Sequence, residues 1–332
     1  MTTDRVALDG PADITLRARE LSRTFGATQA VIDLDLELRR GEVLGLLGPN
    51  GAGKTTTMQM LTGNLAPSKG SISICGIDLL DRPVAAKSRL GYLPEAPPLY
   101  KELKVDEYLR LAARLHRVVR DRLAETVANA KRRCGLMDMG HRVIGTLSKG
   151  YQQRVGIAQA IIHTPDVVIL DEPTVGLDPN QIREIRALVR ELSDSHSVIL
   201  STHILPEVEA VCDRVQILHR GRMVYNDTID DLRRHRGTPA LKVAFRNPPA
   251  VDKLSAISGV ASVVHADDGS FRIERSASQD PTDALVRASV DHDWRLTHLA
   301  VERATLEDVF VQLTQRESDA LGASKASEEA LR

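Results

Sequence analysis

The stretch Gly48-Pro49-Asn50-Gly51-Ala52-Gly53-Lys54-Thr55-Thr56 decides how this chain folds. It fits G-x-x-x-x-G-K-[S/T], the pattern of a loop that binds phosphate groups. The apolar residues 41–47 before it predict a buried strand, and the apolar spacing after it predicts a helix over residues 55–64. A strand, a glycine-rich loop and a helix are the context in which this pattern binds a nucleotide.

Each part of this loop has a physical role in holding a polyphosphate. Glycines let the backbone wrap the ligand so that amide N–H groups point at its oxygens, and the helix N-terminus adds about half a positive charge. Lys54 is expected to reach the β- and γ-phosphates, and the Thr55 hydroxyl to ligate Mg²⁺. A chance glycine turn would explain the fixed positions but not the flanking strand and helix, so residues 48–56 are predicted to bind a nucleotide.

The composition limits the class of protein. A length of 332 residues is enough for two domains, while a net charge of −1 and 3% aromatic residues argue against nucleic acid as a partner. The three cysteines lack metal or disulfide spacing, which suits a reducing cytosol. No run approaches 18 apolar residues, and residues 1–11 lack the apolar core of a signal peptide. We therefore expect a cytoplasmic protein that serves any membrane process through a separate partner.

Hydrophobic periodicity predicts an α/β domain over residues 13–235, which begins with strands at 14–18 and 31–38 and ends with a hairpin over 215–225. Strands alternate there with helices, which favours a largely parallel sheet with its ligand at the carboxyl ends of the strands. Apolar residues fall at helical spacing over 105–115 and 123–130, which predicts a helical insert at 101–146 within a subdomain covering about 96–160. This insert holds eleven Lys and Arg against six Asp and Glu, a net +5, which suits either solvated helix faces or a position near acidic lipid head groups.

A second, small α+β domain is predicted over residues 240–315, after the break at Pro239. Its apolar pattern reads βαββαβ, the ferredoxin-like order, followed by a last helix at 306–313. No catalytic cluster is visible in it, so ligand sensing, dimerisation and docking all stay open as its role. Residues 316–332 are rich in Ala, Ser and charge and are expected to form a disordered tail.

Two carboxylates, Asp171 and Glu172, follow the four apolar residues 167–170. Asp171 is expected to hold Mg²⁺ through water. Glu172 is expected to polarise the attacking water as general base, a role worth roughly 10² to 10⁴ in rate. A strand end that simply turns polar would explain one acid, but it explains two less well.

Ser148 is predicted to cap a helix, with its hydroxyl bonded to the free amides of the next turn. A helix end of this kind is a second site suited to an anion. Because the chain already has one phosphate loop, the second site suggests contact with the nucleotide of another subunit. An ordinary capped helix is the alternative.

Six motifs in this order resemble the ATPase subunits of ABC (ATP-binding cassette) transporters over residues 14–235. They are the phosphate loop, Leu90-Gly-Tyr-Leu-Pro-Glu95, Leu147-Ser-Lys-Gly150, Leu170-Asp-Glu-Pro173, Gly176-Leu-Asp178 and Ser201-Thr-His203. The resemblance implies that two identical subunits pair head to tail around two ATP molecules. Ser148 and Gly150 of one subunit would then meet the γ-phosphate held by the other. The residues that hold it there would be Gly51, Gly53, Lys54 and Thr55.

The resemblance also implies roles for three residues that their local pattern does not explain. Phe25 would stack on adenine, Asp178 would lie on the dimer seam, and His203 would contact the γ-phosphate and keep the attacking water in register. The sequence departs from the family at Glu95, where Gln is usual. Glu95 can still ligate Mg²⁺, but it adds a negative charge near the phosphates. At Lys149 and Tyr151 the family usually has Gly and Gln; Lys149 could add positive charge near the partner's ATP or face water.

The residues of several motifs, together with the closing Leu306-Glu-Asp-Val-Phe310, are similar to those of ATPases of ABC-2-type exporters, nearest the gliding-motility-associated kind. This implies a peripheral subunit on the inner face of the membrane that uses ATP and Mg²⁺ to power a separate transmembrane permease. The alternative is a soluble ABC-type ATPase that acts on nucleic acid or ribosomes. Against it, the chain has one phosphate loop and neither a long heptad run nor a cysteine cluster.

Overall fold

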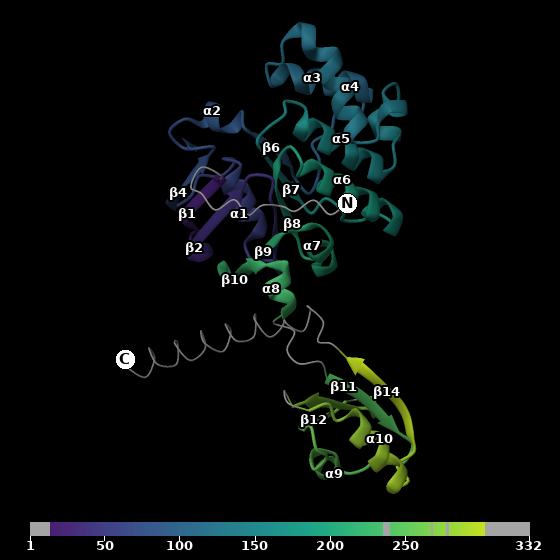
Figure 1. The fold of residues 1–332 in the computed structure, drawn as a ribbon. Coiled ribbons are helices and arrows are strands. Elements are labelled where there is room, and N and C mark those ends of the chain that lie inside the picture. The colour runs from purple at the N-terminus through teal and green to yellow at the C-terminus, as the bar shows by residue number, and fades with distance from the viewer. Residues whose placement is uncertain (1–13, 235–239, 267, 277–278, 303–332) are drawn as a thin grey trace, which may run out of the picture. The chain divides into compact units, whose positions relative to one another are not determined.

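The computed structural model describes residues 14–234, 240–266, 268–276 and 279–302. Their contacts divide the chain into two compact units after Ile229 (Figure 1). Residues 1–13 lie outside the described residues. So do the helix expected at 306–313 and the tail expected at 316–332. Among the residues described, no helix combines the length and apolar character that crossing a bilayer requires.

The first unit begins with an antiparallel sheet in the order β2-β1-β4-β5. Its strands are β1 (Ile14–Phe25), β2 (Thr28–Arg39), β4 (Lys69–Ile74) and β5 (Ile77–Asp78). The sequence predicted only residues 14–18 and 31–38 as the first two strands, which is too short. The pairing of β1 with β2 shifts register between Ala18 and Leu21, where Glu20 has a φ of 47°. This bulge breaks the apolar alternation while keeping Leu21 buried.

A six-stranded sheet in the order β10-β9-β3-β8-β7-β6 forms the centre of the unit. Its strands are β3 (Val43–Leu47), β6 (Leu90–Leu93), β7 (Val167–Asp171), β8 (Ser197–Thr202), β9 (Arg214–His219) and β10 (Arg222–Thr228). All pairs are parallel except the β9–β10 hairpin, as predicted. Every residue of β3, β7 and β8 is buried, which explains their unbroken apolar runs. Parallel pairing places the carboxyl ends of these strands at one edge.

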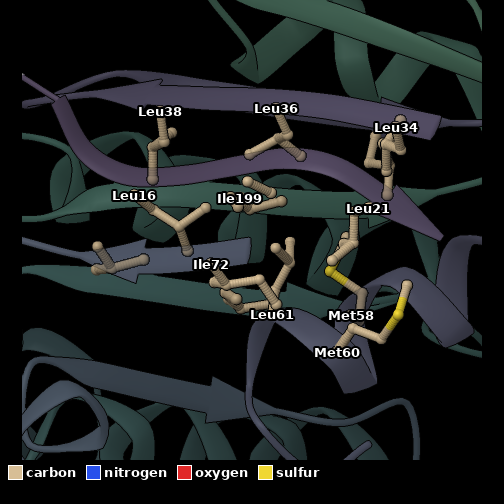
Figure 2. Close-up of a cluster of buried hydrophobic side chains, with 14 of the residues drawn as sticks. Leu16, Leu21, Leu34, Leu36, Leu38, Met58, Met60, Leu61, Ile72 and Ile199 are labelled. Carbon is tan, nitrogen blue, oxygen red and sulfur yellow. The ribbon is translucent and has the colours of Figure 1, made fainter. Parts of the chain in front are cut away.

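The main core of the unit lies between the two sheets. Figure 2 shows Leu16, Leu36 and Ile72 of the antiparallel sheet meeting Leu61 of α1 and Ile199 of β8. The helices of the unit are α1 (Lys54–Leu61), α2 (Pro83–Lys87), α3 (Val105–Leu115), α4 (Leu123–Arg133), α5 (Lys149–Ile161), α6 (Pro179–Leu192) and α7 (Leu205–Val211). Short 3₁₀ turns cover Arg120–Arg122, Met137–Met139 and Ile144–Thr146. Helices α3, α4 and α5 pack against one another, and α3 and α4 lie within the predicted insert at 101–146 (Figure 1).

The second unit has the ferredoxin-like architecture that its apolar pattern predicted. It follows α8 (Ile229–Arg234) and consists of β11 (Ala240–Phe245), α9 (Val251–Ser255), β12 (Val260–His265), β13 (Phe271–Arg275), α10 (Thr282–Asp291) and β14 (Leu296–Glu302). The strand order is β12-β13-β11-β14, and every pair is antiparallel. Its own core includes Leu241, Phe245, Phe271, Leu285 and Trp294.

Candidate nucleotide-binding and hydrolysis site

The phosphate loop joins the carboxyl end of β3 to the start of α1. Gly53 precedes the helix with a φ of 104°, and a Cβ built there would lie 2.5 Å from the Ala30 carbonyl oxygen. A Cβ at Gly48 would meet the Leu218 carbonyl oxygen at the same distance. Only glycine therefore fits at both positions. No side chain caps α1, so its first amides remain available to an anion.

A cleft of about 540 Å³ opens over this loop. The predicted site residues that line it are Asn50, Gly51, Gly53, Lys54, Thr55, Thr56, Glu95, Glu172 and His203. Gly48, Pro49 and Ala52 belong to the loop but do not line the cleft, and Gly48 and Ala52 are buried beneath its surface. The fold thus brings residues from four separate segments of the chain to one cleft.

Lys54 supplies a buried positive charge to this cleft. Its Nζ donates to the carbonyl oxygens of Gly48 at 2.7 Å and Pro49 at 3.3 Å, and it lies 3.9 Å from Oε1 of Glu172. Burial lowers the pKa of Lys54, while the nearby carboxylates of Glu172, Asp171 and Glu95 oppose this shift. The ammonium group therefore lies among carboxylates, in a place suited to a polyphosphate.

Asp171 ends β7 and is only 2% exposed. Burial raises the pKa of Asp171, and the Ser201 hydroxyl on the paired strand opposes the rise. Its Oδ1 is buried and has no hydrogen-bond partner among the described residues. A buried carboxylate oxygen without a partner is costly, which is typical of a group that binds a ligand.

Glu172 and His203 contact each other at the carboxyl ends of β7 and β8. The φ of Glu172 is 48°, in the left-handed region that non-glycine residues rarely adopt, and its N–H donates to the Ser201 carbonyl oxygen at 2.9 Å. Nδ1 of His203 lies 2.9 and 3.0 Å from the two carboxylate oxygens of Glu172. Because a carboxylate can only accept, the imidazole donates from Nδ1, which leaves Nε2 for another contact.

Ser148 occupies the N-cap position of α5, but its hydroxyl makes no capping hydrogen bond. The prediction that this hydroxyl bonds the next amides is therefore wrong, and the Ser148 side chain is exposed. Gly150 is buried, and a Cβ there would lie 2.6 Å from Cδ of Gln181. Neither Ser148 nor Gly150 lines the cleft over the phosphate loop. The Lys149 ammonium extends over Gly176.

Two further predicted residues also lie outside the lining of the cleft. Asp178 caps α6 by accepting from the amides of Asn180 at 2.9 Å and Gln181 at 3.0 Å. Phe25 ends β1 with 47% of its surface exposed, and the Arg23 guanidinium stacks over its ring at 4.6 Å. A stacking role for Phe25 and a position on a dimer seam for Asp178 stay predictions.

Sequence reasoning missed part of the cleft wall. The missed residues are Thr28, Gln29, Ala30, Val175 and Arg220. Arg220 lies in the β9–β10 turn beside Gly221, whose N–H donates to the Ala52 carbonyl oxygen at 2.9 Å. The hairpin was visible in the sequence, but its place beside the phosphate loop follows only once β9 is known to pair with β3.

Comparison with known proteins decides the family. Residues 31–175 match the family model described as ABC transporter, and residues 228–314 match "ATP-binding protein DrrA1-3-like, C-terminal domain". The bacitracin transport ATP-binding protein BcrA of Bacillus licheniformis is 31% identical over 90% of this chain and 96% of its own length. This chain belongs to the ABC transporter ATP-binding family.

Other ABC proteins extend this agreement. The daunorubicin resistance ATP-binding protein DrrA3 of Streptomyces coeruleorubidus is 32% identical over 91% of this chain and 96% of its own length. A solved structure titled "Structure of ATP binding subunit of ABC transporter" is 36% identical, with a TM-score of 0.61 over 67% of this chain and 93% of that one. The resemblance drawn from six motifs is therefore confirmed, and the chain is an ABC ATPase.

Proposed function

We propose that this ABC protein is the ATP-hydrolysing subunit of an exporter and that it works as a homodimer on the inner face of the membrane. The observation that carries the proposal is the contact between Glu172 and His203 in a cleft whose floor is the phosphate loop. The names of BcrA and DrrA3, a transport and a resistance protein, support an exporter.

In this proposal Glu172 acts as the general base. Its carboxylate accepts a proton from the water that attacks the γ-phosphorus, and the bond from His203 fixes the direction of the carboxylate. Because phosphate oxygens only accept, His203 bridges Glu172 and the γ-phosphate when both of its ring nitrogens carry a proton, with Nδ1 donating to the base and Nε2 to the phosphate. Lys54 stabilises negative charge on the transferred phosphoryl oxygens.

The described residues fit a magnesium ion beside the phosphates. Thr55 and Glu95 line the cleft, and Asp171 ends the neighbouring strand with a buried Oδ1 that has no partner in the described part of the chain. Hydroxyl, carboxylate and phosphate oxygens are the ligands that Mg²⁺ prefers. When bound, Mg²⁺ would neutralise charge on the β- and γ-phosphates. Asp171 and Thr55 would hold it, with Glu95 as a third oxygen donor.

The position of Ser148 supports a second copy of the chain. The N-terminus of α5 carries exposed residues and an uncapped first turn, yet it lies outside the cleft of its own subunit. Placed against the phosphate loop of a partner, Ser148 and Gly150 would supply donors to the outer side of the γ-phosphate. The two halves of each ATP site would then come from different subunits.

A second cleft supports a permease as the membrane partner. It measures about 340 Å³, and its lining includes Tyr92, Pro94, Pro98, His116, Gln159 and His163. Pro94 lines this cleft and the next residue, Glu95, lines the ATP cleft. Because proline restricts the backbone on both sides, this short segment is a stiff link between the two clefts. We propose that a short cytoplasmic helix of the permease occupies the second cleft.

Fractionation of cells that express the chain with and without a candidate permease tests this function. We expect ATPase activity in the purified chain and its recovery with membranes only when the permease is present. Arg114→Glu, an exposed charge reversal in the last turn of α3, should reduce membrane recovery more than ATPase activity. Arg39→Glu, an exposed reversal at the end of β2, is the matched control and should reduce neither. Recovery with ribosomes or DNA after a salt wash would support the alternative instead.

A further inference from the structure

Glu207 is a buried acid that the mechanism above does not use. It lies in the first turn of α7 and is 1% exposed. One carboxylate oxygen accepts a hydrogen bond from the Thr174 hydroxyl, and the other accepts from the Thr202 hydroxyl at 2.9 Å. An acid at this depth is stable only when its oxygens are bonded, so these two threonines determine where it sits.

The two threonines flank the groups that act on ATP. Thr174 is two residues after Glu172, and Thr202 immediately precedes His203. The Thr202 hydroxyl also accepts from the N–H of Ile204 at 3.1 Å, which fixes the turn that carries His203. One side chain of α7 therefore ties the segment after β7 to the end of β8, at the point where Glu172 and His203 contact each other.

A helix-capping role does not account for this arrangement. No side chain makes a capping hydrogen bond to α7, and both oxygens of Glu207 are engaged by threonine hydroxyls. An acid that only complements the helix dipole needs no specific side-chain partners. The burial of Glu207 and its two specific partners point to a different role.

We propose that Glu207 is a positioning residue that holds Glu172 and His203 in register for hydrolysis. This role rests on the ATPase function proposed above. Glu207 does not line the ATP cleft, so it does not contact the nucleotide. Its loss should slow turnover while leaving the phosphate loop, and hence ATP affinity, unchanged.

The test compares Glu207→Gln, Thr202→Val and the double variant in the full-length protein. Gln keeps the shape but presents an amide that cannot accept from one of the two hydroxyls. We expect kcat to fall about tenfold, the low end of what losing a supporting partner costs at metal sites. KM and the affinity for a fluorescent ATP analogue should stay within twofold of wild type. The double variant should be no slower than the slower single variant, because both changes act on the same hydrogen bond between Glu207 and Thr202.

Glu42→Gln is the matched control for losing a buried carboxylate. Glu42 is 8% exposed, accepts from Nε of Arg214 at 2.7 Å, and precedes β3 at the end opposite the phosphate loop. This variant should melt at a lower temperature while keeping its kcat below that temperature. If the wild type is active and Glu207→Gln retains kcat, or loses kcat and ATP affinity together, the positioning role of Glu207 is wrong. The proposed ATPase function is not affected by that result. A wild type without ATPase activity overturns the proposed function as well.

Discussion

Helices α1 and α5 both begin at a motif suited to phosphate, and they differ in what surrounds that end. The start of α1 opens into a cleft that also holds Glu172 and His203. The start of α5 carries the exposed Ser148, outside that cleft. At its other end, α5 contributes Gln159 and Ala160 to the second cleft.

We interpret this difference as a division of roles, with ATP hydrolysis at the start of α1 and the transmission of movement along α5. The groups proposed to act on ATP gather at α1 within one chain, whereas the start of α5 lies outside that cleft and is proposed to contact the phosphate of a partner subunit. Helix α5 has 13 residues, or about 20 Å at 1.5 Å per residue. It therefore spans from the proposed contact with a partner's ATP to the proposed permease cleft. Closure of the dimer at one end would move the cleft at the other.

Replacing Glu172 with Gln tests the hydrolysis proposed at the start of α1 and should have the largest effect on activity. The amide cannot accept the proton of the attacking water, so kcat should fall by roughly 10² to 10⁴. ATP affinity should remain, and ATP should then trap a dimer that gel filtration detects. Glu191→Gln, an exposed change in α6, is the control and should keep normal turnover. Unchanged turnover in Glu172→Gln would remove Glu172 from the mechanism.

Mixing two inactive variants tests whether α5 acts on the partner's ATP. Lys54→Ala removes a charge from the phosphate loop, and Ser148→Arg blocks the start of α5, so each homodimer should be inactive. A heterodimer has one composite site with both parts intact. Random pairing would therefore restore about a quarter of wild-type activity in a symmetric dimer, unless the two sites are obligately coupled.

The control for this mixture pairs Lys54→Ala with Glu172→Gln. Both residues lie in the same cleft of one subunit, so no heterodimer contains an intact site and no activity should return. If Ser148→Arg alone hydrolyses ATP at the wild-type rate, α5 does not act in trans. The distinction between the two helices would then rest on position only.

The sequence predicted the phosphate loop, the central strands and the ferredoxin-like unit because local patterns determine them. A glycine loop between an apolar strand and a helix, or a run of alternating residues, carries its own signal. The length of β1 was underestimated because a bulge at Glu20 shifts the apolar phase, and that of β2 because its first residues, 28–30, are not buried. Periodicity alone cannot distinguish such a shift from the end of a strand.

Contacts between distant segments were the part that the sequence could not predict. Arg220 and Glu207 carry no recognisable local motif. Arg220 lines the cleft, and Glu207 contacts the threonines beside Glu172 and His203, only because of the order of strands in the sheet. The Ser148 hydroxyl shows the opposite case, where a strong local preference for capping was overridden. A single side chain has a choice of rotamers that residue type does not fix.

The smallest expected effect concerns pH at the far end of α5. His163 follows this helix, stacks on His116 with ring centroids 3.7 Å apart, and has Nε2 at 3.1 Å from the Leu90 carbonyl oxygen. A helix C-terminus favours a cation, but burial, with contributions from the nearby His116 and His196, lowers the pKa of His163 to about 4 against the opposing effect of the Leu90 carbonyl. The folded protein therefore holds this imidazole neutral at physiological pH.

His163 should consequently make folding stability depend on pH between about 4 and its ordinary pKa of about 6.5. In that window the unfolded chain binds the proton and the folded chain does not, so stability is full above pH 6.5 and falls as the solution is acidified. His163→Gln can keep a donor to Leu90 but cannot titrate. The loss of melting temperature between pH 7.5 and 5.0 should shrink by about 2 °C in this variant, whereas the exposed control His141→Gln should behave as wild type. An unchanged loss in His163→Gln would show that proton binding at α5 does not distinguish it from α1.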